Sequence, residues 1–321
     1  MKVLVIGAGI SGCVCARRLF DFGHEVTVVE KGRGVGGRMS TRLMNGARID
    51  HGAQFFTLRD KRLLKYLQEW QDNDSVVEWY DHIPDRSDLA DHPRFRGVLG
   101  MTDPIKHLSR YFKVEKNFFA QSIQWSGESW IVKEKADTGR SLMADYLVLT
   151  LPAPQMLELF SRSSFELQPQ VMIKLKKIRY SSCFALFGLL DHGSGIPDPG
   201  IFSHPTPDID WLADNQIKGI SEKPAFTLHA SAKFSDEIWN LPDQEAVSYF
   251  VPVIERLMNA KILNWDIHRW RFAKPLVTFG ESHFNSSALR LSLAGDGFGG
   301  KRIESAAISG FEAAESIFQG D

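Results

Sequence analysis

The sequence predicts an α/β fold in which a dinucleotide-binding domain is discontinuous along the chain and a second domain is inserted into it. Three observations predict this fold. The buried apolar run Val3–Ile6 leads into a glycine turn and a helical segment. The same order of strand, glycine turn and helix returns over residues 289–311. The middle of the chain supplies further strands and helices, which we expect to form the insertion.

The first turn, Gly7-Ala-Gly9-Ile-Ser-Gly12, has the glycine spacing of a Rossmann-type domain. Gly7 permits the sharp turn, and Gly9 lets the backbone approach a pyrophosphate. Gly12 lets the expected helix, Cys13–Phe22, pack closely on the strand. The free N–H groups at the start of this helix favour phosphate. The segment therefore predicts that the chain binds a dinucleotide.

An acid and a second glycine cluster follow. Glu30 comes after a second expected strand, Glu25–Val29, where its carboxylate can accept a hydrogen bond from an adenosine ribose. The next residues, Lys31–Met39, are mostly bare backbone, and Arg38 among them offers a guanidinium fork that matches phosphate oxygens. A simple NAD enzyme needs no such second cluster, whereas the longer FAD does. The cluster therefore favours FAD, with a flexible surface loop as the alternative.

The third cluster, Gly295-Asp296-Gly297, follows the expected strand Leu289–Ala294 and precedes a small-residue helix that begins at Ile303. Its aspartate could accept hydrogen bonds from ribityl hydroxyls, and the helix start could stabilise negative charge on a reduced flavin. Another buried strand, Tyr146–Thr150, runs into a turn at Pro152. We expect the carboxyl end of that strand to face the cofactor as well.

These segments predict the domain boundaries. We expect residues 1–57, 97–155 and 265–321 to form the Rossmann-type FAD-binding domain, and residues 58–96 and 156–264 to form a substrate domain of mixed β-sheet and helices. The other expected elements are helices over 59–72, 104–112 and 244–257, and strands over 125–134, 142–149, 178–190 and 225–234. In the first of these helices we expect one buried side made of Leu63, Leu64, Leu67 and Trp70.

Charge and composition exclude several classes of partner. A formal net charge of -1 gives no electrostatic case for nucleic acid or an anionic membrane. No apolar run approaches the ~20 residues of a membrane span. The 3 cysteines and 10 histidines show no metal-ligand spacing, so we expect no metal. We expect a cytoplasmic protein that is a monomer or a weak dimer.

Further segments match a known family, in order, over essentially the whole chain. They are Gly36–Thr41, Asp50–Phe55, Val148–Pro154, Tyr180–Ser182, His268–Arg271 and Gly295–Phe298. With these residues the chain resembles the renalase-like family, which contains the bacterial relatives of renalase, within the flavin-containing amine oxidase superfamily. The resemblance implies non-covalent FAD and oxidation of the 2- and 6-dihydro isomers of NAD(P). Hydride would pass to flavin N5, and dioxygen would be reduced to hydrogen peroxide.

Carried over by position, Ser11, Arg38, Ala53 and Gln54 would contact FAD. The full set of candidate cofactor-binding residues is Gly7, Gly9, Ser11, Gly12, Glu30, Lys31, Gly37, Arg38, Met39, Ala53, Gln54, Pro152, Asp296, Gly297 and Ile303.

Flavin hydride chemistry needs mainly correct position and a dry pocket. Our candidate catalytic residues are Phe55, Tyr180, His229 and Trp270, with Phe298 as a further pocket wall. Tyr180 and Trp270 could stack on a nicotinamide ring. His229 could hydrogen-bond a carboxamide or a water. For each residue, ordinary core packing is an equal alternative.

Two other functions remain open. The chain could be a flavin amine oxidase or a desaturase-like oxidoreductase with a small organic substrate. Many amine oxidases place a lysine near flavin N5 on the strand equivalent to 180–186, and this stretch has none. Lys174, Lys176 and Lys177 precede it, in what we expect to be a solvated segment. The third possibility is an NAD-binding protein without flavin.

Overall fold

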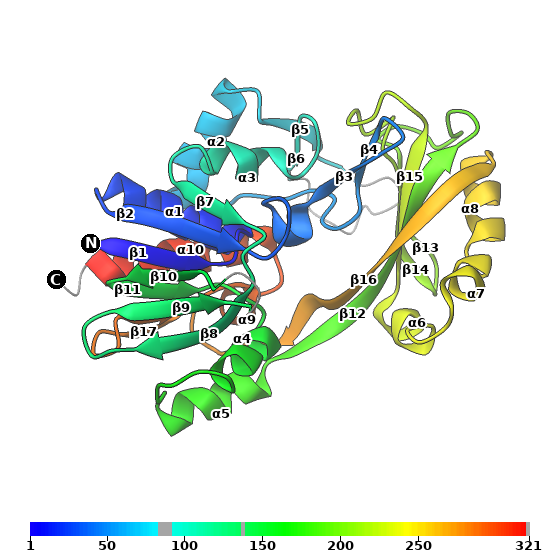
Figure 1. Ribbon diagram of the computed structural model, residues 1–321. Helices are drawn as coiled ribbons and strands as arrows, with labels where there is room; N and C mark the ends of the chain where they lie inside the picture. The colour runs from blue at the N-terminus through cyan, green and yellow to red at the C-terminus, as the bar shows by residue number, and fades with distance from the viewer. Residues whose placement is uncertain (83–91, 136–138, 319–321) are drawn as a thin grey trace. The chain divides into compact units, whose positions relative to one another are not determined.

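We analysed a computed structural model of the chain, which describes residues 1–82, 92–135 and 139–318 (Figure 1). The chain divides into two compact units. Unit 1 is Met1–Gly37, Ile105–Tyr180 and Lys274–Asp321, and unit 2 is Arg38–Pro104 and Ser181–Ala273. Among the described residues, no helix is both long and apolar enough to cross a bilayer.

Both units are discontinuous in sequence, but their boundaries differ from those of the expected domains. Residues 38–57 lie in unit 2 because they contain a hairpin, residues 41–50, whose buried side chains pack with Phe187 and Ala225. Residues 156–180 lie in unit 1 because two helices there contribute to its core. Part of the expected substrate domain, residues 83–91, lies outside the described residues.

Unit 1 contains a six-stranded sheet. In sheet order its strands are β17 (Phe284–Ser286), β18 (Leu291–Leu293), β11 (Tyr146–Leu149), β1 (Lys2–Ile6), β2 (Glu25–Glu30) and β7 (Lys113–Lys116). All neighbours are parallel except β17, which pairs antiparallel with β18. Ile6 lies opposite Leu149, and Leu149 lies opposite Leu293. The carboxyl ends of three strands that are distant in sequence therefore lie at one edge.

Helices and a second small sheet complete unit 1. α1 (Ile10–Asp21) and α10 (Ile303–Phe318) pack closely, since a Cβ on Gly310 would lie 2.0 Å from the Ser11 carbonyl oxygen. The small sheet is antiparallel, with β8 (Ala120–Trp125), β9 (Trp130–Glu134) and β10 (Ser141–Ala144). The remaining helices are α3 (Asp103–Leu108), α4 (Ala153–Phe160), α5 (Pro169–Lys177) and α9 (Asp296–Gly299).

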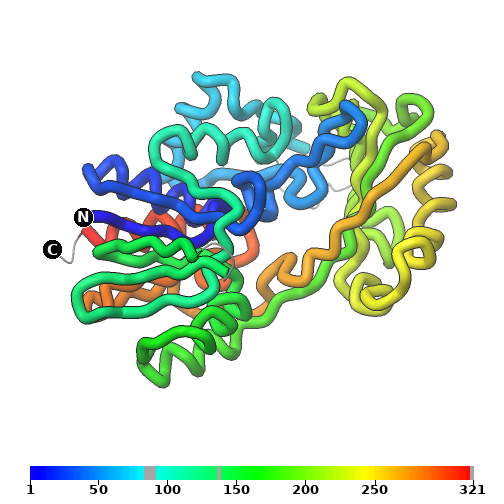
Figure 2. The backbone as a smooth tube through the Cα atoms, viewed as in Figure 1, coloured from blue at the N-terminus to red at the C-terminus, as the bar shows by residue number. Residues whose placement is uncertain are grey.

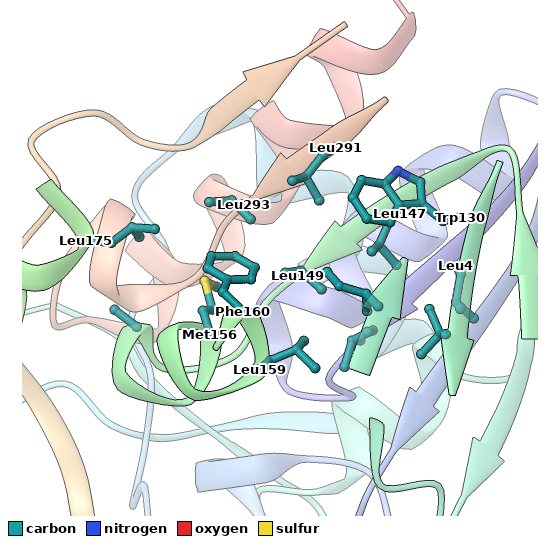
Figure 3. Close-up of a cluster of buried hydrophobic side chains, with 14 of the residues drawn as sticks. Leu4, Trp130, Leu147, Leu149, Met156, Leu159, Phe160, Leu175, Leu291 and Leu293 are labelled. Atoms are coloured by element: carbon teal, nitrogen blue, oxygen red, sulfur yellow. The ribbon is translucent and has the colours of Figure 1, made fainter. Parts of the chain in front are cut away.

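The core of unit 1 joins these elements. Figure 3 shows side chains of α4 and α5 gathered beside those of the parallel strands and Trp130. The labelled members are Leu4, Trp130, Leu147, Leu149, Met156, Leu159, Phe160, Leu175, Leu291 and Leu293. The four members from β11 and β18 are fully buried, as expected for parallel strands covered on both faces.

Unit 2 is organised around a five-stranded sheet, in which the long strands β12 and β16 run side by side (Figure 2). The order is β13 (Ile201–Thr206), β14 (Ile209–Asp214), β15 (Ala225–Ala230), β12 (Arg179–Leu190) and β16 (Ile262–Val277). Two hairpins add β3 (Thr41–Met44) with β4 (Ala47–Asp50), and β5 (Val76–Tyr80) with β6 (Arg94–Gly97). The helices are η1 (Gly37–Met39, which begins in unit 1), η2 (Lys61–Leu63), α2 (Leu64–Asp72), α6 (Ala232–Glu237), α7 (Asp243–Ser248) and α8 (Val251–Met258).

Several expected elements are shorter or divided. The expected strand 125–134 is interrupted by a turn at 126–129, and the expected strand 142–149 is two strands, β10 and β11. The expected strand 225–234 ends at Ala230, where Ser231 caps α6. The expected helix 244–257 is broken between α7 and α8, just before Pro252, whose ring cannot continue a helix from the preceding turn.

One further expectation needs correction, and one is confirmed. In α2, Leu64 is 44% exposed, and Tyr66 takes the buried position instead. The buried side consists of Leu63, Tyr66, Leu67 and Trp70, which follow the spacing i, i+3, i+4 and i+7, and Leu64 lies one position outside it. The lysines at 174, 176 and 177 are exposed on the helix α5, as expected, and its Val171 and Leu175 are buried.

Candidate functional site

Two of the three glycines in the turn after β1 could not be replaced by larger residues without a shift. Gly7 has a φ of +111°, and a Cβ there would lie 2.7 Å from Thr150 Oγ1. A Cβ on Gly12 would lie 2.0 Å from the Gly7 carbonyl oxygen, so α1 directly contacts the turn. A Cβ on Gly9 would meet nothing within 4 Å. The turn is therefore closed on the side of the helix and open at Gly9.

Ser11 adds an unsatisfied polar group to this turn. Its hydroxyl is buried at the first turn of α1 and has no hydrogen-bond partner in the part of the chain that the structure describes. Buried hydroxyls in proteins are normally paired. The N–H groups of the first turn of a helix also lack partners within the helix. An anionic oxygen at the open side of the turn would satisfy both.

Glu30 ends β2 with a half-buried carboxylate that two backbone amides hold in place. Ala8 N donates to Oε2 at 3.0 Å, and Gly32 N donates to Oε1 at 2.8 Å. Gly36 N donates to the Ala8 carbonyl oxygen at 2.8 Å, so the second glycine loop closes on the first turn. Each carboxylate oxygen keeps a lone pair that could accept from a sugar hydroxyl.

The two other candidates in the second loop differ in position. Lys31 is exposed, so its side chain extends into solvent beside the loop. Gly37 has a φ of +54°, and a Cβ there would lie 3.5 Å from the Gly9 Cα. Gly37 therefore lies against the first turn.

The third glycine turn lies at the same edge of the sheet. Gly295 has a φ of +129°, and a Cβ there would lie 3.6 Å from the Thr150 carbonyl oxygen. Gly295 N donates to Ser309 Oγ at 2.8 Å, which ties the turn to α10. Asp296 is buried at the start of α9, and Ile303 begins α10. Segments from both ends of the chain thus converge within unit 1.

Tyr180 is the candidate catalytic residue that lies beside this turn. A Cβ on Gly297 would lie 2.5 Å from the Tyr180 hydroxyl oxygen. Ala153 N, next to Pro152 at the start of α4, lies 3.4 Å from the same oxygen in donor geometry. The structure therefore brings together Tyr180, Pro152 and Gly297. Phe298 packs on Phe279 in the core, with ring centroids 4.7 Å apart, so core packing accounts for it.

Four candidate cofactor residues belong to unit 2. Arg38 Nη1 donates to the carbonyl oxygens of Phe272 and Ala273 at 2.9 and 3.2 Å, which anchors the end of the glycine loop to β16. Ala53 N donates to the Arg38 carbonyl oxygen at 2.8 Å. Met39 is buried. The expected contact of the Arg38 guanidinium with phosphate stays a prediction.

The fourth of these residues, Gln54, has a buried carboxamide whose NH2 group is hydrogen-bonded to its own loop. Its Nε2 donates to the carbonyl oxygens of Asp50 and Gly52, at 2.5 and 3.0 Å. Its Oε1 lies 3.4 Å from Lys218 Nζ. Gln54 therefore holds the loop of residues 50–54 in a fixed shape.

His51 lies at the centre of an aromatic group in unit 2. Its carbonyl oxygen accepts from Trp270 Nε1 at 3.0 Å and lies 3.3 Å from His229 Nε2. Its ring lies 5.4 Å from the rings of Trp270 and His268. The candidates His229 and Trp270 are thus brought together by one residue. Sequence reasoning gave His51 and His268 no role, although both lie in segments that carried the resemblance.

Comparisons with known proteins identify the family. Residues 5–70 match the NAD(P)-binding Rossmann-like domain, and residues 113–318 match the flavin-containing amine oxidoreductase family. The second match covers more than half of the chain. The chain belongs to the flavin-containing amine oxidoreductase family. Membership places it among FAD-dependent oxidoreductases, and FAD is its cofactor.

Individual relatives agree with this family at the level of the fold. A protein from Exiguobacterium sp. 255-15, described as a candidate protoporphyrinogen oxidase, is 12% identical, with a TM-score of 0.76 over 100% of this chain and 99% of that one. A triple mutant of putrescine oxidase is 13% identical, with a TM-score of 0.71 over 100% and 99% of the two chains. The 4,4'-diapophytoene desaturase of Staphylococcus aureus strain Newman is 43% identical over 60 residues, which are 19% of this chain and 12% of that protein.

The residues of unit 1 fit the FAD of this oxidoreductase family. The open side at Gly9 leaves the space that a Cβ would fill, and the orphaned Ser11 hydroxyl lies in the same turn. The Glu30 carboxylate is fixed at the end of the neighbouring strand. We propose that these groups hold the pyrophosphate and the adenosine ribose.

Unit 2 contains a buried ion pair that was not predicted from the sequence. Lys218 Nζ lies 2.7 Å from Asp50 Oδ2, and both side chains are fully buried. Asp50 Oδ1 also accepts from Thr41 Oγ1 at 2.6 Å and from Met101 N at 2.9 Å. Burial lowers the pKa of Lys218, and Asp50 opposes this shift. Only the position of Asp50 at the start of a resemblance segment could have indicated the pair, because Lys218 is distant in sequence and stands in no recognised motif.

The pKa of His51 predicts a pH dependence of stability. Burial, followed by the charges of His268, Arg42 and His229, lowers this pKa to about 3. Unfolded histidine has a pKa of about 6.5, so between these values unfolding takes up a proton and stability falls as the pH falls. We expect His51→Gln to reduce the slope of unfolding free energy against pH by about 1.4 kcal/mol per unit between pH 6 and 4.

The measurement is urea denaturation of both proteins across that pH range. Glutamine can keep the contact of His51 Nε2 with Ser40 Oγ, which measures 3.4 Å. The change in slope, not in absolute stability, is the result that counts. Equal slopes in the two proteins would show that His51 titrates normally.

Proposed function

We propose that the chain is a renalase-like FAD-dependent oxidase that converts 2- or 6-dihydro isomers of NAD(P) to NAD(P)+. When bound, FAD would supply the hydride acceptor at N5, and dioxygen with one proton from solvent would be the final oxidant, giving hydrogen peroxide. FAD is bound non-covalently in a cytoplasmic protein that is a monomer or a weak dimer. The substrate contacts come from the candidate residues Tyr180, Phe55, His229 and Trp270.

The observation that carries this proposal is the positive charge around the candidate residues of unit 2. The Arg94 guanidinium carbon lies 5.8 Å from the Phe55 ring. Arg94 donates to the main-chain carbonyl oxygens of Asp81 and His92. Its charge is therefore not matched by a hydrogen-bonded carboxylate in the described residues. Such surroundings favour a substrate that carries phosphate groups over a cationic amine.

Arg96 adds positive charge, whereas the neighbouring histidines add none. Arg96 Nη1 donates to the carbonyl oxygens of Gly97 and Val98, at 3.1 and 3.0 Å. The lowered pKa values of His51 and His268 keep both rings neutral near pH 7. The strand β12 carries no lysine. These features support a dihydronicotinamide substrate more than a polyamine.

The contacts of His229 and Trp270 fit them for binding and orienting a carboxamide-bearing ring. His229 Nε2 lies 3.3 Å from the His51 carbonyl oxygen, so the His229 ring is held at the same loop as Trp270. Trp270 Nε1 is already bonded to the same oxygen, so its role is packing. Neither residue needs to transfer a proton, because hydride transfer to a flavin needs none from the protein.

Anaerobic flavin reduction tests the proposal. The purified holoenzyme is mixed in separate experiments with 2- and 6-dihydro-NAD(P), with ordinary 4-dihydro-NADH and with polyamines, and flavin absorbance is followed. We expect rapid bleaching with the 2- or 6-dihydro isomers. Rapid bleaching only by a polyamine would instead assign the chain to the amine oxidases of its family. Bleaching only by another small organic donor would assign it a desaturase-like reaction.

A further inference from the structure

Three aromatic residues of unit 2 form a cluster, and only Phe55 among them has a role in the proposed function. The Phe55 ring lies 5.8 Å from the Tyr80 ring and 5.7 Å from the Trp211 ring. We call these residues the aromatic cluster. Tyr80 ends β5, and Trp211 lies in β14, so two separate sheets supply them. Tyr80 is 8% exposed and Trp211 is 9% exposed, whereas Phe55 is only half-buried.

The cluster contains two hydrogen-bond donors that the fold leaves unsatisfied. Tyr80 Oη and Trp211 Nε1 are out of contact with solvent, and neither has a partner in residues 1–82, 92–135 and 139–318. By contrast, the indole N–H groups of two other tryptophans in unit 2 have hydrogen-bond acceptors. Trp79 Nε1 donates to the Pro199 carbonyl oxygen at 3.2 Å, and Trp270 Nε1 donates to that of His51. Two orphaned donors in one cluster are unusual in a folded interior, where polar groups are paired.

The charge next to the cluster indicates which kind of ligand could accept hydrogen bonds from these two donors. The Arg94 guanidinium carbon lies 5.1 Å from the Tyr80 ring and 5.8 Å from the Phe55 ring. Burial raises the pKa of Tyr80, although Arg94 opposes the shift, so its hydroxyl remains a donor. A ligand here must therefore offer acceptor atoms, and negative charge near it would be favoured. A polar ring carrying acceptors, attached to phosphate, has both properties.

We propose that the aromatic cluster is a binding subsite for a planar heterocyclic base of the substrate, with Tyr80 Oη and Trp211 Nε1 donating to its acceptor atoms. The half-buried Phe55 packs against the ring, and Arg94 favours the attached phosphate. This inference rests on the proposed function, because a dinucleotide has two such bases. Nicotinamide offers a carboxamide oxygen, and adenine offers ring nitrogens.

Conservative variants test the subsite. Tyr80→Phe removes only the hydroxyl, and Trp211→Phe removes the indole N–H while it keeps an aromatic ring. Nicotinamide mononucleotide and AMP are the probes, and their binding to the holoenzyme is measured by titration calorimetry. We expect one of the two probes to bind at least tenfold more weakly to both variants. The melting temperature of Tyr80→Phe should not fall, because the hydroxyl lost has no partner.

Two matched controls accompany these variants. Tyr249→Phe alters a tyrosine that is 52% exposed, and Trp125→Phe alters an indole of unit 1. Neither should change the affinity for either probe. Unchanged affinity in both cluster variants would show that the aromatic cluster is ordinary core and would overturn the subsite. Failure of the wild-type holoenzyme to bind either probe would overturn it too. If one variant does not fold, the other decides.

The result can be separated from that of the proposed function. If 2- or 6-dihydro-NAD(P) bleaches the flavin and both cluster variants keep the wild-type KM, the function stands and the subsite fails. If no dihydronicotinamide bleaches the flavin, the function fails. In that case a selective loss of probe binding in the variants would still place a planar ligand at the cluster.

Discussion

Gly9→Ala is expected to leave the apoprotein as stable as the wild type and to weaken FAD binding at least tenfold, which is about 1.4 kcal/mol. The new Cβ would meet no protein atom within 4 Å. It would occupy the open side of the turn, where we place the pyrophosphate. Gly12→Ala is expected to damage both properties, because its Cβ would lie 2.0 Å from the Gly7 carbonyl oxygen. Overpacking of this kind costs about 1–3 kcal/mol of unfolding free energy.

Urea denaturation of the apoproteins and fluorimetric titration with FAD measure the two effects. Gly195→Ala is the control, because its Cβ would lie at an ordinary 3.6 Å from the Asn259 Cβ, in unit 2. The control should change neither stability nor FAD affinity. Wild-type FAD affinity in Gly9→Ala would show that the phosphates bind elsewhere. Equal apoprotein stability of Gly12→Ala and the wild type would show that α1 can move away from the turn at little cost.

Lys218→Met is expected to lower the unfolding free energy by about 3–5 kcal/mol, because it leaves the Asp50 carboxylate charged, buried and without its cation. The lysine ammonium and the aspartate oxygen are 2.7 Å apart, with both side chains fully buried. Asp50→Asn should cost a similar amount, since it leaves the ammonium group unpaired. The double variant should lose less than the sum of the two single variants, because no net charge then stays buried.

Urea denaturation of the four proteins gives this coupling energy. Lys174→Met is the matched control, because Lys174 lies 2.6 Å from Glu281 in an exposed pair, with side chains 47% and 54% exposed. Its cost should stay below about 1 kcal/mol. If Lys218→Met were no worse than this control, solvent or another anion would have to reach Asp50.

The glycine turns could be predicted from the sequence because the local backbone geometry of the turn and its helix requires each glycine. The spacing of Gly7, Gly9 and Gly12 follows from a tight turn and a helix that contacts it, and neighbouring residues determine both. The turn at Gly295 could be recognised for the same reason. In α2, by contrast, the adjacent residues Leu63 and Leu64 both suit a helical stripe with Leu67, and only Leu63 is buried. Local periodicity does not decide which of two adjacent apolar residues faces the core.

The sequence by itself determined that this chain has a dinucleotide fold with three glycine turns and an acid after the second strand. Only the tertiary structure decided which distant side chains meet. The pairing of Lys218 with Asp50, the gathering of His229 and Trp270 around His51, and the cluster of Tyr80 and Trp211 all join segments far apart in the chain. The physical reason is that a turn's geometry is fixed by adjacent residues, whereas burial, charge pairing and orphaned donors depend on which surfaces the fold closes together.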